Sequence, residues 1–192
     1  MLQLDDSLTV GKGANRTVYV HPSDENKCIK ISNSESSRTQ ALESAYYKAL
    51  ESTAISWAHI SRFYGEIETN LGEGYVYELV RDFNQTISLP LSNYLSSVPA
   101  TNIKIEIILE SLAELKNYLI KNKIIVRNLR PYNIVFKRMN SNFGRMVIID
   151  NIGHHNNCFH LSDHVSFLAR KDIHKKWNKF ELSIQNTNVF KL

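Results

Sequence analysis

The sequence contains few of the residues that define several specialised classes of protein. Its 192 residues include only two cysteines, seven glycines and four prolines. Two cysteines are too few for a disulfide framework, and they form no CxxC motif of the kind that binds zinc. The low glycine and proline content excludes a repeat protein and a long disordered linker.

Long apolar segments are also missing. No stretch approaches the eighteen uninterrupted apolar residues that a membrane-spanning helix needs. The first ten residues, MLQLDDSLTV, are acidic and too poor in apolar side chains for a signal peptide. We therefore expect a cytoplasmic protein without a membrane partner.

The overall composition is that of an ordinary globular protein. Hydrophobic residues make up 43% of the chain and charged residues 22%. The net charge of +4 favours anionic ligands, but it is too small to indicate nucleic acid as a partner. A chain of this length suits one domain, or two small lobes that share a cleft.

The pattern of the first eighty residues predicts strands around one helix. Apolar and β-branched runs predict strands within 7–22, 26–32, 62–70 and 74–80, the first of them interrupted by a glycine turn. Good helix formers predict a helix over 34–52. Its predicted buried face consists of Ala41, Leu42, Ala45, Tyr46, Ala49 and Leu50.

The second half is predicted to be mostly helical. The polar connector 81–93 is the best candidate for a boundary between lobes. A long amphipathic helix is predicted over 101–123, with Thr101 or Asn102 as its N-terminal cap. Its predicted apolar stripe is Ile105, Ile108, Leu109, Leu112, Leu115 and Leu119. Two strands, 133–138 and 145–150, follow around a turn, and 161–185 predicts a basic amphipathic helix.

Four residues of the first half are candidates for a phosphate site, and each has a simpler alternative. Gly11 and Gly13 lie between two strands, where glycine lets backbone N–H groups approach phosphates, although a plain hairpin turn has the same pattern. Lys30 lies in an apolar strand, where it needs a partner or ligand if buried and none if it faces solvent. Glu43 fits either a solvated helix face or the ion partner of Lys30.

The segment IIVRNLRPYNIVF, residues 125–137, matches the catalytic-loop pattern of protein kinases, H-R-D-L-K-P-x-N. Asn128 occupies the position of the catalytic aspartate, and Arg130 replaces the lysine. The matching positions are Arg127, Leu129, Pro131 and Asn133. Asp150 follows at the end of the strand VIID, so Asn133 and Asp150 offer two oxygen ligands to a hard cation that bridges phosphates.

Taken together, these motifs resemble the protein-kinase-like superfamily and, more narrowly, the YrbL family of small bacterial proteins of the PhoP regulatory network. The segments that carry the resemblance are KCIKI, GYVYELV, NKIIVRNLRPYNIVF, DNIG and YVHPSDENKC. The resemblance implies one compact α+β, kinase-like two-lobe domain over 1–192. It would have an antiparallel N-lobe sheet with one helix (about 1–80), a hinge (about 78–84) and a truncated helical C-lobe (about 85–192).

The resemblance also implies ATP and Mg²⁺ as cofactors and gives the candidate residues their roles. Lys30 would hold the α- and β-phosphates and pair with Glu43, and these two join Asn128 and Arg130 as the catalytic set. Asn133 and Asp150 would bind magnesium. The other residues expected to contact the nucleotide are Gly11, Gly13, Val18, Tyr77, Glu78 and Val80, the last two at the hinge.

The chain departs from the kinase pattern in ways that bear on activity. Asn128 can orient an acceptor hydroxyl but accepts no proton, so Asn128→Asp is expected to raise any transferase activity or leave it unchanged. DNIG is one residue longer than DFG, and the short remaining chain leaves no room for an activation loop. The expected function is a weak or unusual phosphotransferase with a regulatory role, acting on a protein or small-molecule acceptor. The alternatives are an inactive pseudokinase, serving as a nucleotide-dependent binding module, and an AMP transferase.

The C-terminal part holds a group of histidines and a basic run. A metal site near Cys158 and Asp163 is conceivable, but the spacing matches no strong zinc motif, and solvated or structural roles are the simpler interpretation. The histidines are His154, His155, His160 and His164. The basic run predicts a solvated helix face or, alternatively, contact with an acidic partner or RNA.

Overall fold

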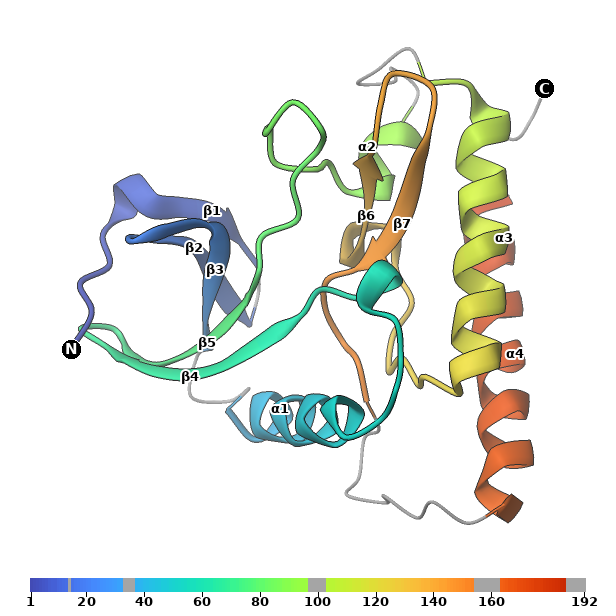
Figure 1. Ribbon diagram of the computed structural model, residues 1–192, viewed down its shortest axis with the longest axis horizontal. Helices are drawn as coiled ribbons and strands as arrows, with labels where there is room; N and C mark the ends of the chain where they lie inside the picture. The colour runs from blue at the N-terminus through green and yellow to red at the C-terminus, as the bar shows by residue number, and fades with distance from the viewer. Residues whose placement is uncertain (14, 33–36, 97–102, 154–162, 186–192) are drawn as a thin grey trace. The chain divides into compact units, whose positions relative to one another are not determined.

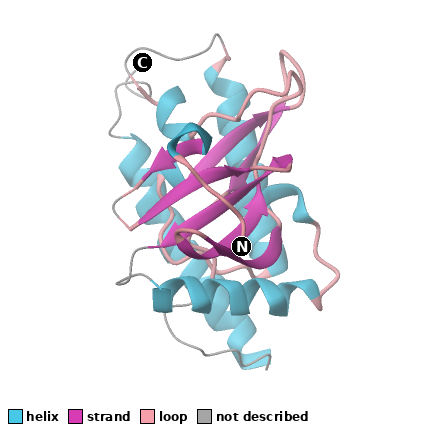
Figure 2. Cartoon of the chain, turned by 90° about the vertical axis from the view of Figure 1, so that its left-hand side faces the viewer, coloured by secondary structure: helices cyan, strands magenta, loops and turns pink. Residues whose placement is uncertain are grey.

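The computed structural model describes residues 1–13, 15–32, 37–96, 103–153 and 163–185, and it divides into two compact units (Figure 1). The first unit comprises Met1–Trp57 with Ser61–Val80, and the second comprises Ala58–Ile60 with Arg81–Leu192. The described elements form a mixed α+β protein with antiparallel sheets and four α-helices (Figure 2).

The first unit is built on a five-stranded antiparallel sheet. The strand order is β1-β2-β3-β5-β4, and every predicted strand of this half is confirmed. The strands are β1 (Thr9–Lys12), β2 (Arg16–His21), β3 (Asp24–Ser32), β4 (Phe63–Thr69) and β5 (Gly72–Glu78). One side of the sheet is covered by a small core of Leu4, Tyr19, Ile29 and Val76.

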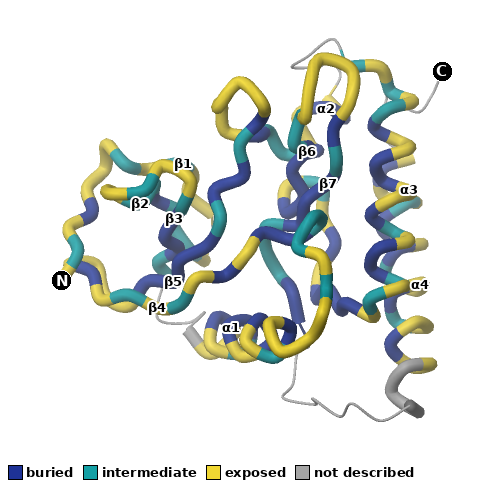
Figure 3. The backbone as a smooth tube through the Cα atoms, in the orientation of Figure 1, coloured by how far each residue is buried: buried dark blue, intermediate teal, exposed yellow. Residues whose placement is uncertain are grey.

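The predicted helix of the first unit is confirmed as α1 (Ser37–Glu51), along which buried and exposed residues alternate (Figure 3). Its predicted buried face is wrong at Ala41 and Ala45, which are exposed. The residues that α1 buries are Gln40, Glu43, Ser44, Tyr46, Tyr47 and Leu50. Three of these are polar, and each has a partner within the unit, which offsets the cost of burial. A prediction based on apolar spacing misses a face of this kind.

The second unit combines a two-stranded sheet with three helices. Its elements are α2 (Leu91–Tyr94), α3 (Ile105–Asn122), β6 (Ile134–Arg138), β7 (Gly144–Ile148) and α4 (Asp163–Gln185). The N-cap of α3 is Lys104, which makes no side-chain capping hydrogen bond, and the predicted caps Thr101 and Asn102 lie outside the described residues. The predicted stripe of α3 is buried at 108, 112, 115 and 119, but Leu109 is exposed.

Helix α4 lies beside α3 and is held there by one apolar face (Figure 1). The side chain of Glu181 links the two helices, since it accepts a hydrogen bond from Trp177 Nε1 at 2.6 Å and pairs with Lys116 Nζ of α3 at 3.2 Å. The buried face of α4 consists of Ala169, Ile173, Trp177, Phe180 and Ile184. The exposed face carries Arg170, Lys171, Lys175 and Lys179, so the predicted basic amphipathic helix is confirmed.

A glycine at the start of β7 allows close packing in the second unit. A Cβ atom on Gly144 would lie 2.5 Å from Phe136 Cζ and 2.6 Å from the carbonyl oxygen of Lys137. Because a backbone atom is involved, the strain has little room to relax. We expect Gly144→Ala to destabilise the protein by about 2 kcal/mol and to lower the melting temperature by roughly 4–8 °C.

Circular dichroism melts of Gly144→Ala and of Gly11→Ala test this expectation. A Cβ atom on Gly11 would meet nothing within 4 Å, so Gly11→Ala is the matched control and should leave the melting temperature nearly unchanged. Equal melting temperatures for the two variants would contradict the close packing at Gly144.

Candidate functional site

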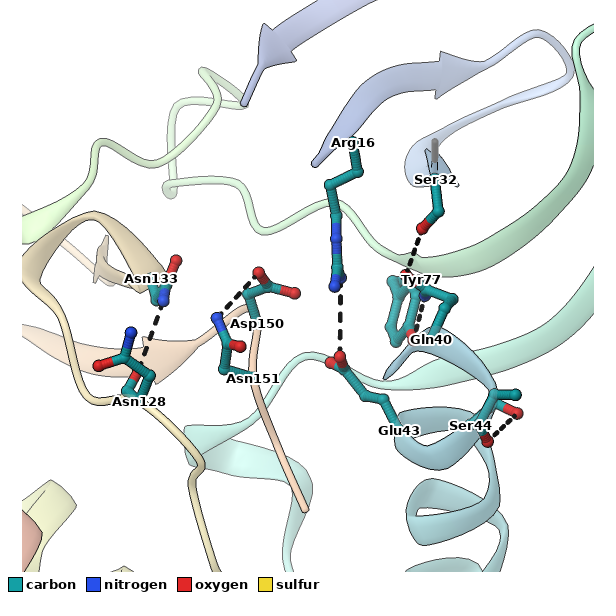
Figure 4. Close-up of polar contacts among 11 residues, drawn as sticks. Arg16, Ser32, Gln40, Glu43, Ser44, Tyr77, Asn128, Asn133, Asp150 and Asn151 are labelled. Carbon is teal, nitrogen blue, oxygen red and sulfur yellow. Dashed lines mark hydrogen bonds and ion pairs between the residues drawn. The ribbon is translucent and has the colours of Figure 1, made fainter. Parts of the chain in front are cut away.

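Lys30 lies in a buried polar cluster of the first unit. Its side chain is 5% exposed, and its Nζ lies 4.1 Å from the centre of the Tyr77 ring, so the alternative of a solvated lysine is wrong. The Tyr77 hydroxyl accepts a hydrogen bond from Gln40 Nε2 at 3.1 Å, and Gln40 Oε1 accepts one from Ser32 Oγ at 3.0 Å (Figure 4). The ammonium group of Lys30 is thus held within the sheet, where a phosphate ligand would meet a desolvated positive charge.

Glu43 is a fully buried carboxylate on α1. Its Oε2 lies 3.6 Å from Arg16 Nη1, whose side chain is only 12% exposed (Figure 4). The pair of Lys30 and Glu43 stays a prediction. The partnership of Arg16 with Glu43 was not predicted from the sequence. The sequence feature that could have indicated this pair is an arginine at the start of an apolar strand, shortly after Gly11 and Gly13.

The glycine turn and the next two strands align three predicted nucleotide contacts. Gly11 of β1 lies opposite Val18 of β2, and Val18 lies opposite Lys30 of β3. Residues directly opposite each other in an antiparallel sheet share one face, so Gly11, Val18 and Lys30 form a row across three strands. Gly13 closes the turn, since its N–H donates to the carbonyl oxygen of Arg16 at 2.9 Å.

The predicted hinge residues lie at the end of β5. Tyr77 is fully buried, and Val80 is buried as well. The backbone N–H of Glu78 donates to the carbonyl oxygen of Arg62 at 2.8 Å, and the Cys28 thiol lies 3.9 Å from the carbonyl oxygen of Glu78. Both the N–H and the carbonyl of Glu78 therefore have partners within the first unit.

In the second unit, backbone hydrogen bonds hold the loop 125–133 against the chain that follows β7. The N–H of Arg127 donates to the carbonyl of Asn151 at 2.7 Å, and the N–H of Gly153 donates to the carbonyl of Ile125 at 2.8 Å. Asn151 and Gly153 both adopt positive φ angles, 65° and 108°, which turn the chain at this point. These two hydrogen bonds, one before and one after Ile152, hold the segment DNIG (150–153) against the loop.

The same region brings the two predicted metal ligands together. The N–H of Ile149 donates to the carbonyl oxygen of Asn133 at 2.9 Å, so Asp150 follows directly on a residue bonded to Asn133. Figure 4 shows Asn133 next to Asn128 and Asp150 next to Asn151. Asn133 Nδ2 lies 3.4 Å from the carbonyl oxygen of Asn128 and Asp150 Oδ2 lies 3.2 Å from Asn151 Nδ2. Because the Asn133 amide donates to the loop, its oxygen is oriented as an acceptor, which fits a cation ligand.

Asn128 and Arg130 form a pair within the loop. Arg130 Nε donates to Asn128 Oδ1 at 3.0 Å, and both side chains are exposed. The N–H of Asn133 donates to the carbonyl of Arg130 at 2.9 Å, which tightens the turn that carries both residues. The two predicted catalytic residues of this unit therefore act as one polar group.

The C-terminal histidines, for which a metal site was the less simple interpretation, lie mostly outside the described residues. Within the described residues, no group of three His, Cys, Asp or Glu side chains is placed to hold a metal ion. His154, His155, Cys158 and His160 lie outside the described residues, and so does the side chain of His164.

One histidine of the second unit is expected to make stability depend on pH. His59 Nδ1 lies 2.9 Å from the carbonyl oxygen of Met146, to which it donates, and its ring packs on Tyr118. Burial lowers the pKa of His59 below its ordinary value. The unfolded chain therefore takes up this proton first, so stability is present above about pH 6.5 and decreases as the pH falls below it.

Thermal melts between pH 7.5 and 5 test this expectation. The wild type should lose more stability over this range than His59→Asn, whose side-chain amide can donate the same hydrogen bond but does not titrate. Parallel losses in the two proteins would assign the pH dependence to other groups.

Comparison with known proteins identifies the family. The family described as PhoP regulatory network protein YrbL matches residues 2–185, which is nearly the whole chain. Proteins named "Uncharacterized protein YrbL" from Escherichia coli (strain K12) and Shigella flexneri are each 32% identical to the chain over 156 residues, covering 80% of it and 74% of the relative. This mixed α+β protein belongs to the YrbL family, as its motifs predict. No helix within the described residues is long and apolar enough to cross a membrane.

Proposed function

We propose that the chain is a compact kinase-like protein of two lobes that binds ATP and magnesium. In this proposal it is an atypical phosphotransferase, of weak or unusual activity and with a regulatory role. The observation that supports it most is the Asn133–Asp150 pair, which the hydrogen bond from Ile149 to Asn133 holds beside the loop 125–133. Two oxygen ligands from this loop and the following strand end suit a magnesium ion that bridges phosphates.

The first unit contributes the proposed nucleotide contacts. Lys30 supplies a desolvated positive charge for the phosphates, and Gly11 and Val18 lie in the same row of the sheet. Tyr77, Glu78 and Val80 are the proposed adenine contacts. Glu43 and Arg16 form the buried ion pair next to this region, and we propose that Glu43 also orients Lys30. When bound, magnesium would neutralise charge on the phosphates.

Asn128, which occupies the position of the general base in kinases, supports two alternatives to a phosphotransferase. Asn128 accepts no proton, which also suits a pseudokinase that binds nucleotide as a regulatory signal, or an AMP transferase. Phosphoryl transfer has a loose transition state in which positioning and charge stabilisation contribute most, so Asn128 does not exclude transfer. The acceptor is a protein or a small molecule, and a cytoplasmic location is part of the same proposal because ATP is supplied there.

Incubation with ATP labelled at the γ- or the α-phosphate tests the proposal. Transfer of γ-label alone to protein or to small molecules in an extract is the expected result. Transfer of α-label would support the AMP transferase. No transfer of either label, by a protein that binds ATP, would support the regulatory module instead.

A further inference from the structure

The hydrogen bond between Arg130 and Asn128 fixes the direction of the Asn128 amide. The guanidinium group of arginine contains only donors, so the amide atom 3.0 Å from Arg130 Nε must be the oxygen. The amide nitrogen of Asn128 is therefore turned away from Arg130. At the position where the kinase loop places a proton acceptor, this loop presents a hydrogen-bond donor.

Arg130 adds a positive charge to this donor. Within the part of the chain that the structure describes, Nε is the only atom of the Arg130 side chain with a hydrogen bond or ion pair, and the Asn128 amide nitrogen has neither. Both side chains are exposed. A guanidinium edge next to an amide N–H group binds carboxylate or phosphate oxygens well, because every hydrogen bond is assisted by charge.

We infer that the acceptor in the transfer reaction is an anionic oxyacid, either a carboxylate or a phosphate monoester. This inference rests on the proposed function and names its substrate class. A hydroxyl acceptor must lose a proton during transfer and therefore benefits from a general base. A carboxylate is already ionised at neutral pH, so its oxygen attacks without one. The exchange of aspartate for Asn128 thus fits an acceptor that has no proton to give up.

The reaction is balanced without a base. A carboxylate oxygen forms a bond to the γ-phosphorus of ATP, and the bond from that phosphorus to the β–γ bridging oxygen breaks. The electron pair of the broken bond leaves with ADP, and the other product is an acyl phosphate. With a phosphate monoester, the product is the corresponding diphosphate. In both cases the total charge is conserved and no proton is transferred.

The inference reverses the effect of Asn128→Asp that the sequence suggests. An aspartate at 128 would neutralise Arg130 and place a second negative charge next to an anionic acceptor, which like-charge repulsion disfavours. Transfer to a carboxylate or phosphate should therefore fall in Asn128→Asp rather than rise.

The decisive test is a titration of the ¹⁵N-labelled full chain, followed by NMR. The side-chain amide signal of Asn128 is assigned by its loss in Asn128→Asp. Sodium acetate and inorganic phosphate are titrated at constant ionic strength, with magnesium and a methylene-bridged ATP analogue that fills the γ-phosphate position. Acetamide and glycerol are the neutral controls. We expect a saturable shift with one anion and none with the neutral compounds, and the anion that binds identifies the acceptor as carboxylate or phosphate.

Two arginine variants test the role of the charge. Arg130→Gln should weaken anion binding by roughly tenfold. Arg170→Gln makes the same change on the exposed face of α4 and should leave anion binding unchanged. Equal effects of the two variants would show general attraction by net charge and would overturn the inference.

The failure of this inference is distinguishable from the failure of the proposed function. Should the protein bind ATP but no anion shift the Asn128 signal, the inference is overturned and the proposed function stands. The inference is also overturned if the ATP analogue abolishes anion binding, because the Asn128 amide and the Arg130 guanidinium then bind the γ-phosphate and not the acceptor. A protein that binds no ATP overturns both.

Discussion

Magnesium-ATP is expected to raise the melting temperature of the protein by roughly 5–10 °C. A ligand at about 100 times its Kd stabilises the folded state by about 2.7 kcal/mol. For a chain of this size, each kcal/mol changes the melting temperature by roughly 2–4 °C. The measurement is a thermal melt with ATP, with and without magnesium, at several nucleotide concentrations. An unchanged melting temperature at saturating nucleotide would contradict the proposed function.

Asp150→Ala should remove the magnesium-dependent part of this shift. Asp150 is the carboxylate of the proposed metal pair, and its side chain is partly exposed, so the variant is expected to fold. Asp172→Ala is the matched control, since Asp172 lies on α4 and pairs only with Lys176 in the described structure. If the melting temperature of the wild type rises equally with and without magnesium, the proposed nucleotide site is supported and the proposed metal site is contradicted.

Asp82→Ala is expected to cause the largest loss of stability among the variants considered. Asp82 is 6% exposed, and its Oδ1 accepts hydrogen bonds from Ser88 Oγ at 2.5 Å and from the N–H of Arg138 at 2.9 Å. Its Oδ2 lies 3.8 Å from Arg138 Nε. Removing the carboxylate leaves these buried donors without their acceptor, which costs about 3–5 kcal/mol. The melting temperature should fall by roughly 6–20 °C.

The control for this variant is again Asp172→Ala, which makes the same chemical change at a half-exposed ion pair. Its cost should stay below about 1 kcal/mol. Similar melting temperatures for the two variants would show that Asp82 contributes no more than a surface charge. Asp82 lies in the predicted hinge segment 78–84, so its bonds to β6 also mean that the second half of this segment is tied to the sheet of the second unit.

The strands could be predicted from the sequence because alternation and turn residues act locally. The buried face of α1 could not, because Gln40, Glu43 and Ser44 are buried through partners on distant strands that local spacing does not reveal. Leu109 of α3 shows the converse: an apolar residue fits the helical period but remains 44% exposed. Polar burial and apolar exposure are both decided by tertiary contacts.

The candidate site was predictable to a similar extent. The spacing of the motifs predicted that Asn133 and Asp150 belong to one region. The hairpin of β6 and β7 between them brings the chain back to the loop 125–133. Spacing also placed Lys30 in its strand, but not its contact with Tyr77. The direction of the Asn128 amide depends on one hydrogen bond from a side chain two residues away, which residue types alone do not determine.

The two tryptophans of the chain fall one in each unit, which gives the protein two built-in fluorophores. Trp57 of the first unit stacks on Tyr47 with ring centres 6.2 Å apart, whereas Trp177 of the second unit is a buried residue of α4. In Trp57→Phe the emission would follow the second unit alone, and in Trp177→Phe it would follow the first. Nucleotide and anion effects could then be assigned to one unit at a time by their spectra.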